Sequence, residues 1–211
     1  MIIRQAETKD LDFIIDCIIE SEKSGGDIFP YSEAFGISVL QFSQIIKGIF
    51  DEEIADQPWC LDHWYVVESE EGDAVAGLSA WVEGVEGVSS DMLKAQILNF
   101  FLKKEWEAAT EKLQVLSSVS IPRIPQYLQL EHLYTHPLHR GIGYMKALIH
   151  YALELYKDFP AEIQVLEINK NAVSLYEYIG FLVSERQCND ALERLSLLSG
   201  NCKLQLIKNH G

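Results

Sequence analysis

The chain has 211 residues, of which 48% are hydrophobic and 23% charged, a composition typical of a globular protein with one sizeable core. Its formal net charge of −15 disfavours nucleic acid and anionic membranes as partners, because both are bound through clustered Lys and Arg. Met1–Glu7 becomes charged too soon for a secretory signal, and no apolar stretch approaches the roughly 20 residues that span a bilayer. We therefore expect a single domain over residues 1–211, located in the cytoplasm. The acidity fits either a cationic substrate or solubility alone.

The four cysteines are Cys17, Cys60, Cys188 and Cys202. They form no CxxC pair, and their spacing relative to histidine does not suit zinc. Four scattered cysteines in a chain of this length do not indicate a disulfide framework either. We expect reduced thiols and no bound metal.

The first part of the chain predicts a short strand and two helices. Residues 2–6 have the composition of a strand, and Asp10 can cap a helix by accepting the free backbone N–H groups of its first turn. Apolar residues recur at helical spacing between Asp10 and Gly25, and again over residues 38–50. Two amphipathic helices are therefore expected, each with one face packed on the rest of the fold.

The remainder predicts a hairpin, a long helix and then alternating elements. Aromatic and β-branched residues fill 59–68 and 74–82 around a Glu-Glu-Gly-Asp turn. A helix is expected over 90–116, before the proline loop 121–125. Strands interleaved with helices follow and indicate an α/β sheet. In order, they are strand 127–135, helix 143–156, strand 162–167, helix 171–178 and two final strands.

A glycine loop follows the predicted strand 127–135. The run Arg140-Gly141-Ile142-Gly143-Tyr144-Met145 comes after a His-Pro pair and opens a helix. Glycine lets the backbone approach a ligand closely, and the unpaired N–H groups at the start of a helix attract anions. Such a run also makes ordinary tight turns, so alone it leaves an anion site and a turn equally open.

A second informative run lies downstream, Asn169-Lys170-Asn171-Ala172-Val173-Ser174-Leu175-Tyr176-Glu177-Tyr178-Ile179-Gly180-Phe181. It matches the motif Asn-x-x-Ala-x-x-Leu-Tyr-x-x-x-Gly-Phe of the GNAT N-acetyltransferase superfamily, and the glycine loop resembles the signature loop of the same family. The two runs occur in the family's order and separation. The chain departs from the signature at Met145, where Gly or Ala is usual.

The resemblance implies a fold class and a cosubstrate. It predicts an α/β fold with a mixed, mostly antiparallel central sheet that is splayed at strands 4 and 5, with helices on both faces. The helix at 90–116 is outside the family's minimal plan, so we expect a helical insertion over about 86–125, between strands 3 and 4. The implied cosubstrate is acetyl-CoA. Its expected contacts are Arg140, Gly141, Ile142, Gly143, Tyr144 and Met145 on the pyrophosphate, backbone N–H groups near Leu133, Tyr134 and Thr135 on the thioester carbonyl, and Asn169, which orients the pantetheine arm or caps a helix.

Acetyl transfer to a primary amine, by direct attack in a ternary complex, needs an acid that protonates the leaving thiolate. The resemblance places Tyr176 in this role. The pKa of a phenol, about 10, is close enough to the thiol value of about 8.5 for that proton transfer. The alternative is that Tyr176 is one helix aromatic among nine tyrosines.

The expected base is Glu131, which projects from the strand near the carbonyl site and whose pKa burial would raise towards neutrality. Strand alternation sends His132 to the opposite face from Glu131. His132 and His136 are weaker candidates for the base. The resemblance also allows a chain of waters in place of a single base.

The expected acceptor site follows the first helix, where Phe29, Tyr31 and Glu33 gather aromatic and acidic groups that suit a protonated amine. A surface loop with incidental aromatics is an equal alternative. The acceptor is expected to be a small-molecule or peptide amine, and a homodimer is left open. The competing function is a catalytically silent CoA-binding sensor or interaction module. A dinucleotide-binding protein ranks last, because the full Gly-x-Gly-x-x-Gly fingerprint is missing.

Overall fold

The structure, a computed structural model, describes residues 1–52, 59–84, 87 and 89–209. These residues form a seven-stranded sheet in the order β1-β2-β3-β4-β5-β7-β6. Neighbouring strands are antiparallel except β4 and β5, which are parallel. The strands are β1 (Ile2–Gln5), β2 (Trp64–Glu68), β3 (Ala74–Val82), β4 (Leu128–Thr135), β5 (Ala161–Leu166), β6 (Leu182–Cys188) and β7 (Cys202–Lys208). The mixed, mostly antiparallel sheet with surrounding helices confirms the predicted fold class.

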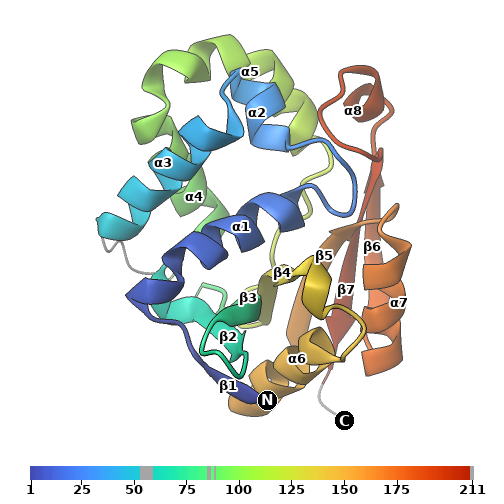
Figure 1. Cartoon of the computed structure of the whole chain (residues 1–211). Helices are drawn as coiled ribbons and strands as arrows, with labels where there is room; N and C mark the ends of the chain where they lie inside the picture. The colour runs from blue at the N-terminus through green and yellow to red at the C-terminus, as the bar shows by residue number, and fades with distance from the viewer. Residues whose placement is uncertain (53–58, 85–86, 88, 210–211) are drawn as a thin grey trace.

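Helices cover both faces of the sheet, and a group of them is stacked beside α1, away from the strands (Figure 1). They are α1 (Leu11–Glu22), α2 (Pro30–Phe35), α3 (Val39–Asp51), α4 (Ser90–Phe101), α5 (Lys103–Ser117), α6 (Tyr144–Leu155), α7 (Lys170–Ile179) and α8 (Ala191–Arg194). Helices α4 and α5 lie between β3 and β4, as the predicted insertion requires. The expected start of that insertion, near residue 86, lies outside the described residues.

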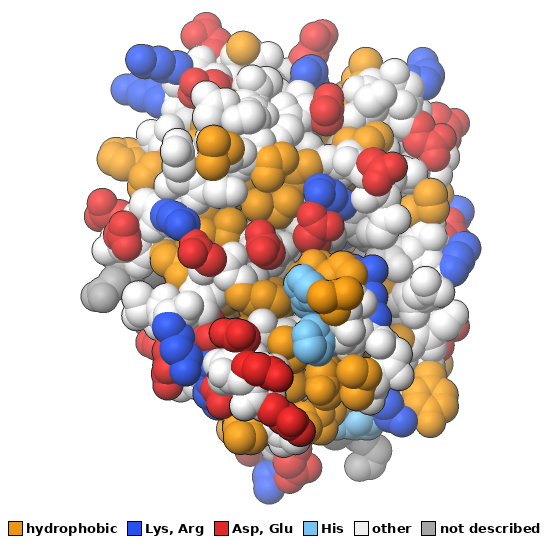
Figure 2. All heavy atoms as spheres, viewed as in Figure 1, with side chains coloured by type: hydrophobic (Ala, Val, Ile, Leu, Met, Phe, Trp, Pro, Cys, Tyr) orange, Lys and Arg blue, Asp and Glu red, His pale blue; other side chains and the backbone are white. Residues whose placement is uncertain are grey.

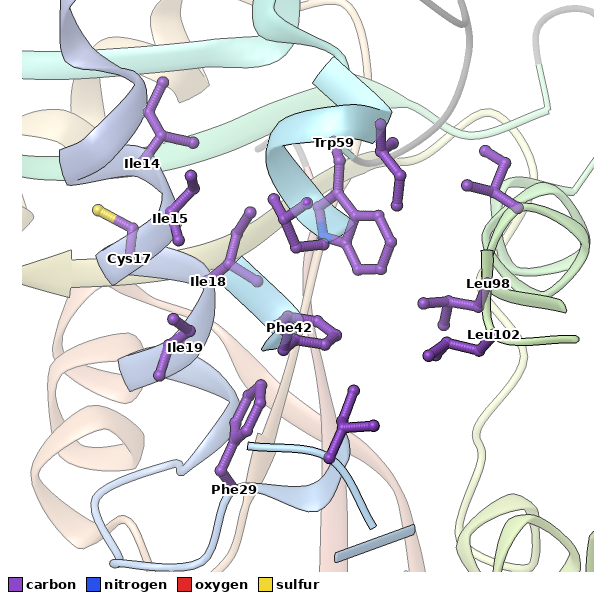
Figure 3. Packing of buried hydrophobic residues seen from close by; sticks show 14 of the residues in the cluster. Ile14, Ile15, Cys17, Ile18, Ile19, Phe29, Phe42, Trp59, Leu98 and Leu102 are labelled. Carbon is purple, nitrogen blue, oxygen red and sulfur yellow. The ribbon is translucent and has the colours of Figure 1, made fainter. Parts of the chain in front are cut away.

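Two apolar clusters stabilise the two faces. The first joins α1 to α2–α5 and includes Ile14, Ile18 and Phe42. Ile14 and Ile18 are one helical turn apart, so both point to the same side of α1, towards Phe42 and Trp59 (Figure 3). The second cluster packs α6 and α7 against the other face of the strands. Helices on both faces are therefore packed against the same sheet.

Several element boundaries differ from the sequence-based prediction. The single helix expected over 90–116 is two helices, because Leu102 leaves helical geometry and buries its side chain, which is 2% exposed, in the first cluster. The first strand of the hairpin begins at Trp64, after a 3₁₀ turn over Leu61–His63. Asp10 does not cap α1; its carboxylate accepts from the backbone N–H of Glu7 at 2.8 Å and pairs with Arg4.

The prediction of four reduced thiols is wrong for two of them, because Cys188 and Cys202 form a disulfide. The two residues are 14 apart in sequence, and the antiparallel pairing of β6 with β7 places them opposite each other. Sequence spacing alone did not reveal this, since the pair becomes adjacent only through the strand register. The single-domain organisation over 1–211 stays a prediction.

Candidate functional site

A cavity of about 1040 Å³ lies between α1, the α4–α5 insertion and the centre of the sheet. Its lining comes from α1 and the loop after it, β4, the glycine loop, β5, α7 and β7. The cavity exists because β4 and β5 separate: their pairing ends at Leu130 and Ile163, although β4 continues to Thr135 and β5 to Leu166. The predicted carbonyl site, Leu133–Thr135, lies on the separated part of β4 and lines the cavity.

A β-bulge in β4 changes which side chains enter this space. Gly77 pairs with Tyr134 and Ser79 pairs with Glu131, so Leu78 alone opposes both His132 and Leu133. The backbone of His132 accommodates the bulge by adopting a positive φ of +54°. The prediction that His132 faces away from Glu131 is therefore wrong, because the bulge interrupts the alternation on which it rested.

His132 is fixed in a neutral state by its neighbours. Its Nε2 accepts from Trp59 Nε1 at 3.2 Å, and its Nδ1 lies 3.1 Å from Ser21 Oγ. The indole N–H can only donate, so the proton of the imidazole belongs on Nδ1. Burial lowers the pKa of His132 to about 4. His132 also stacks on Trp64, which further fixes the ring.

The glycine loop presents unpaired backbone N–H groups. Gly141 and Gly143 have φ of +80° and +93°, values that favour glycine, and α6 begins at the next residue, Tyr144. The N–H of Arg140 donates to Pro137 O at 3.4 Å, whereas those of Gly141–Met145 have no hydrogen-bond partner among the described residues. Positive partial charge thus gathers at the start of α6, where an anion would be stabilised.

The loop also borders the cavity. Arg140, Gly141 and Met145 line it, whereas Ile142, Gly143 and Tyr144 do not. The Nε of Arg140 donates to Thr135 O at 3.0 Å, which positions the guanidinium beside the end of β4. The side chain of Met145 packs against the second apolar cluster. Although Gly or Ala is usual at this position, the methionine side chain points into the core, and the backbone N–H of Met145 is still available to a ligand.

Tyr176 lies in α7 on the wall of the cavity and is 5% exposed. Its hydroxyl makes no hydrogen bond with any described residue, and burial raises the pKa of the phenol well above its ordinary value. The helix that carries it starts at Asn169, whose Oδ1 accepts from the N–H of Ala172 at 3.3 Å. Asn169 thus caps α7, one of its two expected roles, and also lines the cavity.

Glu131 lines the cavity, but its expected pKa is wrong in direction. Burial alone would raise the pKa of this carboxyl; the guanidinium of Arg123 outweighs burial and lowers it to about 2. Arg123 comes from the proline loop, pairs with both Glu131 and Asp91, and lies 5.4 Å over the ring of Trp81. No sequence pattern predicts this partner, because residue 123 belongs to a connection whose path only the fold determines.

Of the three residues expected at the acceptor site, Tyr31 lines the cavity, and Phe29 and Glu33 do not. Tyr31 lines the cavity and its hydroxyl donates to Glu22 at 3.4 Å. Phe29 is 4% exposed and packs edge-on against Phe42 in the core (Figure 3), and Glu33 is exposed on the surface. Of the three predicted acceptor residues, Tyr31 alone is placed where it could contact a ligand in the cavity.

Other charged residues that sequence reasoning missed also line the cavity, among them Glu22, Lys94 and Lys203. Lys94 Nζ is 3.2 Å from Glu22 and lies over the rings of Trp59 and Tyr31, at 5.0 and 5.5 Å from their centroids. Helix α1, the insertion and the last strand supply these residues. No local pattern could have joined positions so distant in the chain.

Charged side chains of both signs lie on the face of the molecule that Figure 2 shows. Figure 2 shows acidic and basic side chains interspersed over the face viewed in Figure 1, without a continuous basic area on that face. Among the residues that the structure describes, no helix is long and apolar enough to cross a bilayer. The same described residues contain no group of three or more His, Cys, Asp and Glu that could hold a metal ion.

Comparison with known proteins places this geometry in context. A family model described as the acetyltransferase (GNAT) family matches residues 41–181, more than half of the chain. No curated protein sequence matches it. Among solved structures the chain is similar to an N-acetyltransferase from Staphylococcus aureus Mu50, with 18% identity, a TM-score of 0.63 and coverage of 98% of this chain and 100% of that one.

Two further structures are similar over nearly their whole length. One is a spermidine N-acetyltransferase SpeG chimera from Vibrio cholerae and hSSAT, with 15% identity, a TM-score of 0.56 and coverage of 100% of this chain and 97% of that one. The other is described as histone acetyltransferase HPA2 and related acetyltransferase from Corynebacterium glutamicum, with 16% identity, a TM-score of 0.61 and coverage of 99% and 96%. At these identities the likeness shows the fold, and the printed substrates belong to those proteins.

Proposed function

The chain belongs to the GNAT acetyltransferase family, and on this premise we propose that it moves an acetyl group from acetyl-CoA to a primary amine by direct attack in a ternary complex. One observation carries the proposal. The unpaired N–H groups of Gly141–Met145 stand beside a cavity that is also lined by Tyr176. The edge of a loop with unpaired N–H groups and a buried phenol thus border the same cavity.

The cavity suits the parts of acetyl-CoA. The pyrophosphate would lie on the loop amides and beside Arg140, where the start of α6 favours negative charge. The pantetheine arm would run through the gap between β4 and β5, past Asn169, and bring the thioester to the N–H groups near Leu133–Thr135. Those backbone groups would stabilise the oxyanion as the amine attacks the carbonyl.

Tyr176 completes the reaction in this proposal. The amine nitrogen forms a bond to the carbonyl carbon, the C–S bond breaks, and the sulfur takes a proton from the Tyr176 hydroxyl. The attacking nitrogen loses one proton, and solvent returns it to the phenolate. A phenol is already protonated at neutral pH at its ordinary pKa of about 10. Burial raises the pKa of Tyr176, which widens the gap to the thiol and makes the proton harder to give up, so the acid role rests on the position of the hydroxyl at the cavity wall.

The role of Glu131 as the base stays a prediction. A carboxyl with a pKa of about 2 is a weak proton acceptor at neutral pH, and the geometry supports a role in positioning Arg123. We therefore expect Glu131→Gln to keep the pH profile of kcat, since the neutral side chain can still accept from Arg123. A profile whose acidic limb disappears in the variant would assign the base to Glu131.

The loop assignment predicts the effect of Arg140→Ala. Removing a charged donor beside the pyrophosphate is expected to weaken acetyl-CoA binding by about tenfold, because a charge-assisted hydrogen bond contributes about 1.5–3 kcal/mol. Isothermal titration measures the change. Arg194→Ala is the matched control: it removes the same charge from an exposed position on α8 and should bind normally. Equal affinities in both variants would contradict the loop assignment.

Two assays test the function as a whole. Acetyl-CoA should raise the melting temperature, by an amount that corresponds to about 2.7 kcal/mol at 100 times the dissociation constant, and NAD and ATP should not. Release of free CoA thiol with a panel of amines then separates an enzyme from a silent CoA-binding sensor. Stabilisation without thiol release from any amine would favour the sensor.

The compartment and the partners are further parts of the proposal. We propose a cytoplasmic enzyme with a small-molecule or peptide amine as acceptor, without nucleic-acid or membrane partners and without a metal.

A further inference from the structure

The charges on the cavity wall are paired with one another almost completely. Four carboxylates line it, and each has a cation within ion-pair distance: Glu20 with Lys23, Glu22 with Lys94, and both Asp91 and Glu131 with Arg123. Of the cations in the lining that the structure describes, Arg140 and Lys203 remain without a carboxylate partner. Arg140 stands at the glycine loop, where the proposed pyrophosphate would neutralise it.

Lys203 stands at the other end of the same charge network. It lies on β7, opposite Leu166 of β5, which also lines the cavity. Its ammonium makes no hydrogen bond or ion pair with a described residue, and burial lowers its pKa. The charges that act on it most strongly are those of Glu131 and Glu22, at the acceptor side of the cavity. Lys203 is half-buried, and a partly desolvated ammonium without a partner has a cost that an anionic ligand in the cavity would offset.

The part of the cavity that would suit the ammonium group of a cationic acceptor is already occupied by a lysine. Aromatic rings with a carboxylate form the usual seat for an alkylammonium group. Here Tyr31, Trp59 and Glu22 surround the ammonium of Lys94. The ammonium group of a polyamine would have to displace Lys94 from this position. An anionic group could pair with Lys203 without displacing any side chain.

We propose that the acceptor is an amine that carries a carboxylate, and that the carboxylate pairs with Lys203 while the amine faces the thioester. This inference rests on the proposed function, because it names the substrate class of the same site. Lys203 acts as a specificity-determining residue in binding. It takes no part in the transfer of the acetyl group, and the carboxylate leaves the reaction unchanged.

Matched pairs of acceptors test the inference on the wild-type protein. Thiol release is measured with L-amino acids, with the corresponding carboxamides, which lack the charge, and with spermidine. We expect kcat/KM to favour the free acid over its carboxamide by roughly 30-fold, mainly through KM, as expected when one partner of a buried charge pair is lost. The amine of a carboxamide is less basic and therefore more often neutral, so the bias of intrinsic reactivity opposes the predicted preference.

Variants then assign the preference to one residue. Lys203→Met should abolish the preference for free acids and leave turnover of the carboxamides and the KM for acetyl-CoA unchanged. Lys157→Met, which removes the same charge from an exposed position, should behave like the wild type. If the Lys203 variant loses activity equally with acids and carboxamides, the lysine serves as a base; if its KM for acetyl-CoA rises, it binds the cosubstrate. Either result overturns the inference.

Different results would refute the acceptor class and the acetyltransferase function. A wild-type protein that acetylates carboxamides or spermidine as well as free acids overturns the inference and leaves the acetyltransferase function standing. A wild-type protein that releases no thiol with any amine of the panel refutes the proposed function, and the inference fails with it.

Discussion

Tyr176→Phe is expected to lower kcat by about 100-fold at saturating acetyl-CoA and acceptor. A positioned general acid contributes roughly 10²–10⁴-fold, and the change removes only the hydroxyl that would protonate the leaving thiolate. The phenyl ring can keep its packing against Phe181, since the hydroxyl makes no hydrogen bond with a described residue. The thiol-release assay gives kcat, and thermal unfolding shows whether the fold is intact.

Tyr178→Phe in the same helix is the matched control. Tyr178 is 73% exposed, and its hydroxyl accepts from Lys146 Nζ at 3.2 Å on the surface. The variant loses the same atom from α7 and should retain full activity. Wild-type kcat in Tyr176→Phe would refute the acid role, and equal losses in both variants would indicate a general effect on α7.

Arg123→Met should destabilise the folded protein by up to about 3 kcal/mol, the lower end of the range for a broken buried ion pair, because it leaves the partly buried carboxylate of Glu131 without its nearest cation. Arg123 is 5% exposed and joins the proline loop to Asp91 and Glu131. Urea unfolding at neutral pH measures the difference. The control is Arg186→Met, which breaks the solvent-exposed pair with Glu167 and should leave the free energy of unfolding unchanged.

The pH dependence of this loss has a definite sign. In the wild type the pKa of Glu131 is lowered from 4.5 to about 2, so its ion pair contributes stability above pH 4.5 that is lost as the pH falls towards 2. In the variant, burial is no longer opposed by Arg123, so the pKa of Glu131 is higher than in the wild type. Protonation of Glu131 as the pH falls then removes the desolvation cost of its charge. The stability gap between wild type and variant should therefore narrow from neutral pH to about pH 4. A gap that widens would contradict the assignment.

The sequence predicts the fold well where local pattern and register agree. The apolar periodicity of residues 11–19 predicts a helix that buries one face, and α1 does so. The aromatic and β-branched runs predict β2 and β3, which are buried along nearly their whole length. Leu102 was not predicted as a break between helices, because burial of its side chain depends on what the two helices pack against. The Cys188–Cys202 bond was missed for a similar reason, since it depends on the register of the last two strands.

The candidate site also has one part that the sequence predicts and one part that it does not. The glycine loop is contiguous in sequence, so its residues predict their own geometry at the start of α6. The acceptor side is assembled from α1, the insertion and β7, and neither Lys94 nor Lys203 stands in a motif. The position of His132 depends on a single extra residue in β4, which strand alternation cannot anticipate.

The central claim is that the backbone N–H groups of 141–145 bind the pyrophosphate of acetyl-CoA. Titration of the ¹⁵N-labelled protein with CoA, followed by amide NMR, tests it most directly. We expect the largest chemical-shift changes at Gly141, Gly143 and their neighbours up to Met145, with slowed hydrogen exchange there. Saturating CoA that shifts other amides and leaves those of this loop unchanged would contradict the account.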